Sequence, residues 1–157
     1  MSEIIYCIDS CSLIGPMNET YPIDVFPGLW ENMSSAFAKK IIISSEIVLA
    51  ELEFQEDEVF KWAKARKEHF LKVDEAVGIL SSEISNKYKG LIDPMATRDQ
   101  ADPFLIALAK IKKAKVVTEE TWSNNIRKAK IPNACKGEGI DCVNFIQMVK
   151  ELGWKFT

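Results

Sequence analysis

The sequence has few of the residues that build zinc sites and disulfide frameworks. Four of its 157 residues are cysteines, and His69 is the single histidine. The cysteines form two loose pairs, Cys7 with Cys11 and Cys135 with Cys142, and neither pair has the Cys-x-x-Cys spacing typical of zinc ligands. We therefore interpret all four as reduced thiols and expect no zinc.

Long apolar runs are also missing. No run approaches the roughly 20 residues needed to cross a bilayer. The chain begins with the polar Met1-Ser2-Glu3 rather than with the basic region of a secretory signal. We expect no membrane segment and a cytoplasmic location. Because low-complexity tracts and linkers are absent too, we expect a single domain over residues 1–157.

The chain also has no excess of positive charge. The formal net charge is −3 at pH 7, which argues against a protein that binds nucleic acid over its whole surface. A metal-dependent nuclease is not excluded, because two bound divalent cations would reverse the sign of this balance.

Strand-like and helix-like segments alternate along the chain. Residues 3–8, 41–43 and 115–118 are short apolar runs typical of buried parallel strands. Helices are predicted over 25–38, 45–54, 102–111 and 143–152, with a turn at 131–133 and a short strand near 140. Two charged stretches, 55–72 and 73–88, predict a helical arm over about residues 55–90. The alternation predicts an α/β fold with a mainly parallel central sheet.

Asp9 directly follows the first predicted strand. Open parallel sheets bind ligands at the carboxyl ends of their strands, so we expect this side chain to project into a binding crevice. Ser10 could orient Asp9 or bind phosphate. The alternative is structural, because an Asp-Ser pair is common in turns and helix caps.

Glu51 interrupts the apolar stripe that Ile47, Val48 and Phe54 form on the predicted helix 45–54. A buried, unpaired charge is costly, so such a group normally has a cation, a hydrogen-bond partner or a raised pKa. The alternative is that Glu51 lies at the edge of the stripe and points to solvent.

Asp102 precedes Pro103 at the start of an apolar helix, where Asp is a favoured N-cap and Pro a favoured first residue. That role could suffice, but Asp102 also heads an inward stripe with Leu105 and could serve the crevice. Arg98 and Asp99, just upstream, are weaker candidates for phosphate or metal contact.

Two adjacent acids, Glu119 and Glu120, follow the strand 115–118. Like charges raise each other's pKa unless a cation intervenes, so a metal site would explain the pair. A solvated loop is the alternative, and Asp141 is a competing late acid.

The order of these acids, with the sequence around each, resembles the successive motifs of PIN domains. The resemblance covers most of the chain, and it is strongest to a PIN-like subfamily long described only as a domain of unknown function. The segments that carry it are Ile8-Asp9-Ser10, Leu49-Ala50-Glu51-Leu52, Ala101 to Ala109, Val116 to Glu120 and Lys130 to Cys135.

The resemblance implies a three-layer α/β/α sandwich, dependence on Mg²⁺ or Mn²⁺, and cleavage of single-stranded RNA that leaves 5′-phosphate and 3′-hydroxyl ends. Such proteins are often homodimers and often the toxin of a toxin-antitoxin pair, so it also implies an antitoxin protein as partner. Carried over by motif, the catalytic metal ligands would be Asp9, Glu51, Asp102 and Glu120, with Ser10 and Thr118 in support.

The chain departs from the PIN pattern in three places. Cys11 stands where many relatives have a small polar residue, Glu120 replaces the usual Asp, and the helical arm is long. Two other functions stay open. A catalytically silent PIN-like module would bind RNA or a protein. A phosphotransfer domain would use Asp9 as a nucleophile, but the dehalogenase pattern needs an acid at position 11 and a receiver needs an acidic pair before its strand-end Asp.

Groups that could contact RNA are present as well. The four tryptophans, Trp30, Trp62, Trp122 and Trp154, could stack on bases, but core packing is their default role. The lysines between positions 110 and 115 could guide phosphates or simply solvate a helix face.

Overall fold

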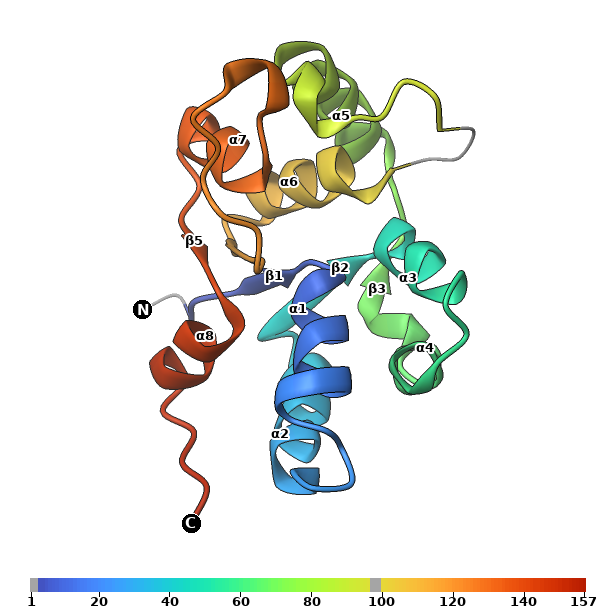
Figure 1. Ribbon diagram of the computed structural model, residues 1–157, viewed down its shortest axis with the longest axis vertical. Coiled ribbons are helices and arrows are strands. Elements are labelled where there is room, and N and C mark those ends of the chain that lie inside the picture. The colour runs from blue at the N-terminus through green and yellow to red at the C-terminus, as the bar shows by residue number, and fades with distance from the viewer. Residues whose placement is uncertain (1–2, 97–99) are drawn as a thin grey trace.

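The structure is a computed structural model that describes residues 3–96 and 100–157. Within these ranges five strands form one parallel sheet in the order β3-β2-β1-β4-β5. The strands are β1 (Tyr6–Ile8), β2 (Ile42–Ser45), β3 (Phe70–Leu71), β4 (Lys115–Val117) and β5 (Cys142–Val143). Helices cover both faces of this sheet (Figure 1), so the predicted three-layer α/β/α fold is confirmed.

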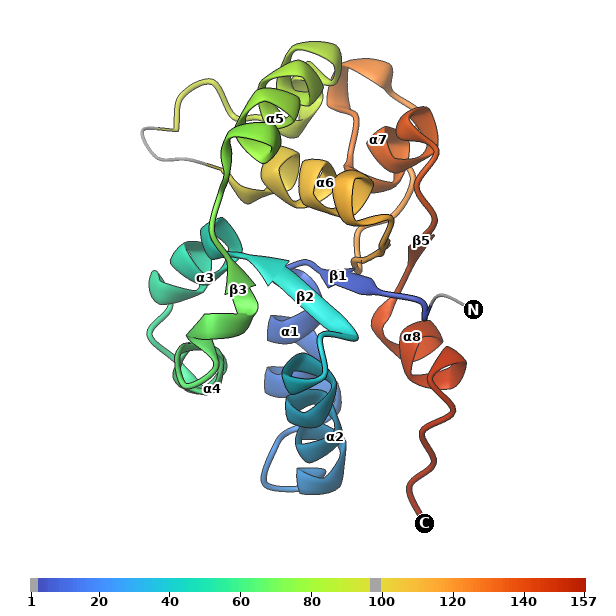
Figure 2. The same cartoon turned by 180° about the vertical axis from the view of Figure 1, so that it is seen from behind.

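The upper layer in Figure 1 contains α5 (Glu75–Lys87), α6 (Ala101–Lys112) and α7 (Ile131–Glu138). The lower layer contains α1 (Cys11–Gly15), α2 (Pro27–Ala38) and α8 (Phe145–Glu151). Helices α3 (Glu46–Glu53) and α4 (Glu58–Lys64) lie beside β2 and β3 at one edge, as the view from behind in Figure 2 also shows. Short 3-10 or π turns are η1 (Pro16–Thr20), η2 (Lys67–His69), η3 (Lys89–Leu91) and η4 (Ile126–Lys128).

Burial explains why these segments form these elements. Strands β1 and β4 are covered on both faces, and Cys7, Ile8, Val116 and Val117 are fully buried, as expected for central parallel strands. Helix α6 lies between the sheet and α5, so nearly all of its apolar run is buried. The sheet and α6 therefore form the rigid centre of the molecule.

The predicted arm contains helices α4 and α5, but the stretch 55–72 is not one continuous helix. Helix α4 ends at Lys64, and the chain then forms η2 and the edge strand β3. Phe70 explains the change: it pairs with Ser44 of β2 and stacks on Phe37 at 5.6 Å between ring centroids. Helical propensity in this charged segment is overridden because one aromatic side chain completes the core.

Three further elements differ from the sequence-based expectation. Strand β1 begins at Tyr6 rather than at residue 3, and the segment 11–20, for which no helix was expected, forms α1 and η1. The predicted turn at 131–133 is wrong, because Pro132 lies in the first turn of α7, where a proline costs no hydrogen bond. No helix in the described part of the chain is both long and apolar enough to cross a membrane.

Candidate active site

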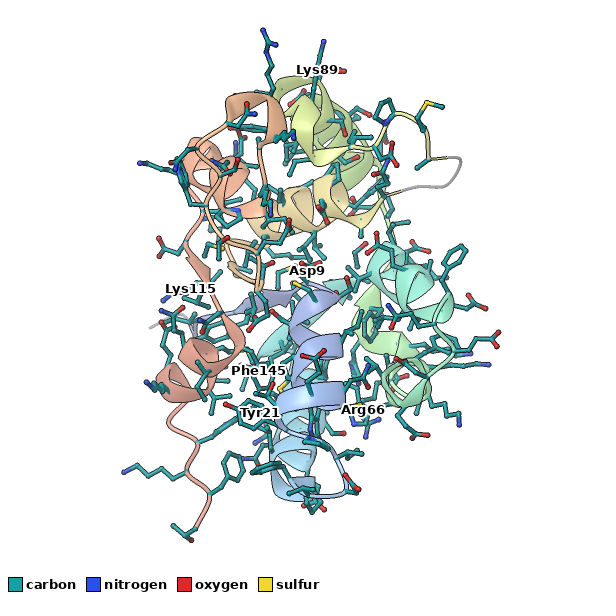
Figure 3. The ribbon with its side chains drawn as sticks, in the orientation of Figure 1. Asp9, Tyr21, Arg66, Lys89, Lys115 and Phe145 are labelled. Carbon is teal, nitrogen blue, oxygen red and sulfur yellow. The ribbon has the colours of Figure 1, made fainter. Side chains whose placement is uncertain are left out.

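Asp9 lies at the carboxyl end of β1, under the upper helical layer, where Figure 3 labels it. Its side chain is buried, with 3% of the residue exposed. Carboxylate atom Oδ2 accepts hydrogen bonds from Thr118 Oγ1 at 3.0 Å and from the Cys11 thiol at 2.9 Å. Atom Oδ1 accepts the Ser10 N–H at 2.8 Å and contacts its hydroxyl at 3.5 Å. Three donors, the Thr118 hydroxyl, the Cys11 thiol and the Ser10 N–H, therefore hold this carboxylate in one orientation.

Burial raises the pKa of Asp9 above its usual range, and the hydrogen bonds from Cys11, Thr118 and Ser10 oppose that rise because they favour the ionised form. These hydrogen-bonding groups are neutral, so they orient the carboxylate without supplying a positive charge.

Glu51 reaches the same place from helix α3. Its Oε1 accepts the Ser10 hydroxyl at 3.4 Å, and its Oε2 accepts the N–H of Ala101, the first residue of α6, at 3.2 Å. Glu51 therefore bridges the end of β1 and the start of α6 instead of pointing to solvent. The predicted apolar stripe is wrong at its end, because Phe54 is 66% exposed and Leu52 is buried in its place.

Asp102 is the second residue of α6, and the N-cap position belongs to Gln100, so the predicted capping role of Asp102 is wrong. Its pKa is raised to about 8 by burial and then by the charges of Asp9, Glu120 and Glu51. All three other candidate acids thus act on Asp102.

Glu120 lies three residues beyond β4, and its N–H donates to Thr118 Oγ1 at 3.2 Å. Burial raises its pKa, followed by the charge of Asp9; Lys130 and a backbone hydrogen bond at Ile131 act in the opposite direction. Glu120 therefore belongs to the same group. We call Asp9, Glu51, Asp102 and Glu120 the acid cluster.

The other late acids have different positions. Asp141 is exposed and precedes β5, so in this parallel sheet it lies at the amino edge, opposite the cluster. Glu119 has a structural role: its Oε2 accepts the Ser12 hydroxyl at 2.5 Å and the Phe145 N–H at 3.1 Å, which ties α1 to the start of α8. Of the three late acids, Glu120 joins the cluster.

Oxygen donors of this kind suit hard divalent cations such as Mg²⁺. The charges of Asp9, Glu120 and Glu51 raise the pKa of Asp102, and those of Asp9 and Glu51 raise the pKa of Glu120, which Lys130 lowers. A bound cation would relieve that repulsion. Among the described residues, however, no three His, Cys, Asp or Glu side chains are already arranged to hold a metal ion. Arg98 and Asp99 lie outside the described residues.

Sequence reasoning missed the role of Cys11, which it treated as a departure from a family pattern. Burial and the charge of Asp9 raise the pKa of this thiol to about 12, so at neutral pH it carries the proton that it donates to Asp9. The available signal was position: Cys11 stands two residues after a strand-end acid, in the first turn of α1.

The lysines and tryptophans that could contact RNA differ in their positions and in their exposure to solvent. Lys110 pairs with Glu138 at 2.8 Å and Lys115 with Glu151 at 3.1 Å. Both lysines lie toward the amino edge of the sheet, away from the acid cluster, because α6 runs from that cluster to the opposite edge. Trp30 and Trp62 are buried, as expected for core residues, but Trp122 is 52% exposed.

Two solved structures share this fold. One is VapBC2 from Rickettsia felis bound to a DNA fragment from their promoter, with 15% identity, a TM-score of 0.51, and coverage of 90% of this chain and 98% of that chain. The other is FitAcB from Neisseria gonorrhoeae, with 17% identity, a TM-score of 0.53, and coverage of 90% and 99%. At these identities the similarity shows the three-layer α/β/α fold and not the activity.

A comparison with curated proteins found no match. Residues 6–156 match the family described as a domain of unknown function, DUF4411. Since this match spans nearly the whole sequence, the chain belongs to the DUF4411 family.

Proposed function

We propose that the chain is a Mg²⁺- or Mn²⁺-dependent endoribonuclease that cleaves single-stranded RNA at the acid cluster. The observation that carries this proposal is the convergence of four carboxylates, from four separate parts of the chain, at the carboxyl edge of the sheet. Ligands of open α/β proteins bind at this edge. RNA as the substrate rests on the resemblance of the motifs to PIN domains.

In this proposal Asp9, Glu51 and Asp102 hold the metal, and Glu120 is a fourth ligand. When bound, one or two such cations make water a better nucleophile and stabilise charge on the phosphate oxygens. Thr118 and Cys11 keep the Asp9 carboxylate in place through their hydrogen bonds. Ser10 contacts both Asp9 and Glu51, because its N–H donates to Asp9 and its hydroxyl, which lies between the two carboxylates, can donate to Glu51.

We further propose that this ribonuclease is a cytoplasmic toxin, that it acts as a homodimer, and that a cognate antitoxin protein controls it. The motif resemblance implies this biology. Support comes from the fold shared with VapBC2, whose crystal structure contains a DNA fragment from the VapBC2 promoter. Coexpression with the product of a neighbouring small gene, followed by copurification, tests the antitoxin part separately from the chemistry.

The experiment for the chemistry compares wild type with Asp102→Asn on structured and unstructured RNAs, in Mn²⁺ or in EDTA. The matched control is Asp141→Asn, the same substitution at an exposed acid on the opposite edge. We expect wild type and Asp141→Asn to cleave unstructured RNA in Mn²⁺ only, and Asp102→Asn to be inactive. Cleavage that survives EDTA, or equal cleavage by Asp102→Asn, would refute the proposal.

One observation favours a second candidate, a silent PIN-like module that binds RNA or a protein. Among the residues that the structure describes, no three His, Cys, Asp or Glu side chains are arranged to hold a metal ion, and a module that only binds would not need such an arrangement. Binding of RNA by wild type and Asp102→Asn alike, without cleavage by either, would identify the silent module.

A further inference from the structure

Trp122 is an exposed aromatic residue close to the acid cluster. It follows Glu120 by two positions, which limits the separation of their Cα atoms to about 7.6 Å. Its exposed fraction of 52% contrasts with the buried Trp30 and Trp62. The ammonium of Lys136 lies 5.1 Å from the centroid of its ring, a distance suited to a cation–π contact. A large apolar ring is thus displayed beside the proposed catalytic centre.

A cavity of about 390 Å³ opens next to this ring. Its wall combines two aromatic rings with small and polar groups, a composition that suits a flat heterocycle with hydrogen-bonding edges. The lining residues are Tyr88, Trp122, Ser123, Asn124, Ala129 and Asn133.

The wall of this cavity is held rigidly by side-chain hydrogen bonds. The amide of Asn133 accepts from the N–H of Ser123 at 3.1 Å and from that of Lys130 at 3.0 Å, and it donates to the Ser123 carbonyl at 2.9 Å. The hydroxyl of Tyr88 donates to Glu138 at 2.7 Å. A preformed wall loses little entropy when a ligand binds.

Close backbone packing also holds the loop that carries Trp122, through contact between its residues 127–129 and Gly90. A Cβ atom added to Gly90 would lie 2.4 Å from the backbone nitrogen of Ala129, so the η3 turn and the end of η4 are in direct contact. The position of the loop relative to the upper layer is therefore set by a glycine that no larger residue can replace without movement.

The segment 121–137, which we call the basic segment, runs from the loop after β4 into α7 and contains no acidic residue in a protein of net charge −3. Its four basic side chains are exposed, and none forms a salt bridge with a residue that the structure describes. Lys130 also acts on Glu120, so the basic segment and the acid cluster adjoin. The four residues are Arg127, Lys128, Lys130 and Lys136.

We infer that the cavity beside Trp122 is a nucleobase subsite, in which one base of a single-stranded RNA stacks on the Trp122 ring. Lys130 and Arg127 then contact the phosphates on either side of that base, and the strand continues from the subsite to the acid cluster. Because every base has a stacking face, the subsite is tolerant of sequence. The inference rests on the proposed function in taking RNA as the ligand.

The charges favour RNA over a protein partner. Basic side chains without a salt bridge to any described residue surround the exposed Trp122 ring, and together they provide phosphate contacts and a stacking platform, which is the combination found in single-strand binding grooves. Amides rather than aliphatic side chains complete the wall. A protein interface of useful size would instead need a larger apolar centre.

The test measures equilibrium binding of a fluorescein-labelled, unstructured 12-nucleotide RNA in EDTA, so that no cleavage occurs. A fully abasic strand of the same length keeps the phosphates and lacks the bases. We expect Trp122→Ala to weaken RNA binding by about 5- to 160-fold, the range that corresponds to the loss of one stacking residue. Trp122→Phe should restore most of the affinity, and the abasic strand should bind wild type and Trp122→Ala equally.

Phe156→Ala is the matched control, because Phe156 is also an exposed aromatic residue but lies against Gly28 of α2, in the lower layer. It should bind RNA like wild type. Unchanged RNA binding by a folded Trp122→Ala protein, or equal weakening toward both strands, would overturn the subsite. So would loss of a copurifying protein from Trp122→Ala with RNA binding intact, which would assign the face to that protein.

The two proposals fail in different ways. If RNA binding depends on Trp122 but wild type does not cleave in Mn²⁺, the nuclease is wrong and the subsite stands. If wild type cleaves and Trp122→Ala binds RNA normally, the subsite is wrong and the nuclease stands.

Discussion

The ionised carboxylate of Asp102 should destabilise the metal-free protein at alkaline pH. Burial and the charges of Asp9, Glu120 and Glu51 raise its pKa from 3.8 to about 8. Between these two values the folded protein holds a proton that the unfolded chain has released. Stability must therefore fall as the pH rises through this window, and the contribution is fully present only below it.

The size of the effect follows from the shift. Four pKa units correspond to about 6 kcal/mol as an upper limit, at about 1.4 kcal/mol for each unit. Because Asp102 is partly exposed and titrates together with neighbouring acids, we expect about 2 kcal/mol. Asp102→Asn removes the ionisation and keeps the shape. In EDTA the variant should thus exceed wild type by about 2 kcal/mol at pH 9, or about 4–8 °C in Tm for a chain of this size.

The assay is thermal unfolding followed by circular dichroism in EDTA from pH 4 to pH 9, with Asp141→Asn as the control. The advantage of Asp102→Asn should grow with pH, and Asp141→Asn should follow wild type. Adding Mn²⁺ at pH 8 should stabilise wild type and leave Asp102→Asn unchanged. An Asp102→Asn protein less stable than wild type at pH 9, or a difference independent of pH, would refute the account of charge repulsion in the cluster.

Three other substitutions test separate contacts. Cys11→Ala should slow RNA cleavage about tenfold in initial-rate assays because a donor to the strand-end carboxylate is lost, whereas Cys11→Ser should stay within about threefold of wild type; equal rates in all three proteins would remove the thiol from the site. Burial acts to raise the pKa of Glu138, but hydrogen bonds from neighbouring cations and a tyrosine outweigh it and lower this pKa from 4.5 to about 2. The ionised Glu138 therefore stabilises the folded protein above pH 4.5, and this stabilisation is lost as the pH falls toward 2. In urea unfolding, Glu138→Gln should be about 1 kcal/mol less stable than wild type at pH 7 and equally stable near pH 2. This difference is smaller than the pKa shift alone would give, because solvent screens the charges. Gly90→Ala should lose about 2 kcal/mol or more, because the new Cβ would meet the Ala129 backbone at 2.4 Å, while Gly15→Ala, with nothing within 4 Å, should be neutral or slightly stabilising.

The sequence predicted the α/β class and the order of most elements because hydrophobic periodicity reports burial directly. It did not predict β3, because a two-residue edge strand has no periodicity of its own and depends on the contact between Phe70 and Phe37. The error at Pro132 has a different cause. A proline is equally common at the start of a helix and in a turn, so the sequence alone did not separate the two.

The candidate acids were chosen from their positions at strand ends and helix starts, and the structure places them together. Their partners required three-dimensional information. Without the family resemblance the adjacent acids Glu119 and Glu120 could not be told apart in the sequence, yet Glu119 accepts the Phe145 N–H at the start of α8 and the charge of Glu120 raises the pKa of Asp102. Trp122 was assigned to the core by its residue type, and only the packing of the loop around it shows that it is exposed.

The hydrogen bond from Thr118 to Asp9 joins residues 109 positions apart. Asp9 follows β1, and Thr118 follows β4, the strand that pairs with β1 in the folded sheet. Folds that depend on contacts of such long sequence separation form slowly. If the acids are catalytic, a growing chain that has reached only Glu51 holds two of them and lacks Asp102, Thr118 and Glu120, so the acid cluster cannot assemble until β4 has been made.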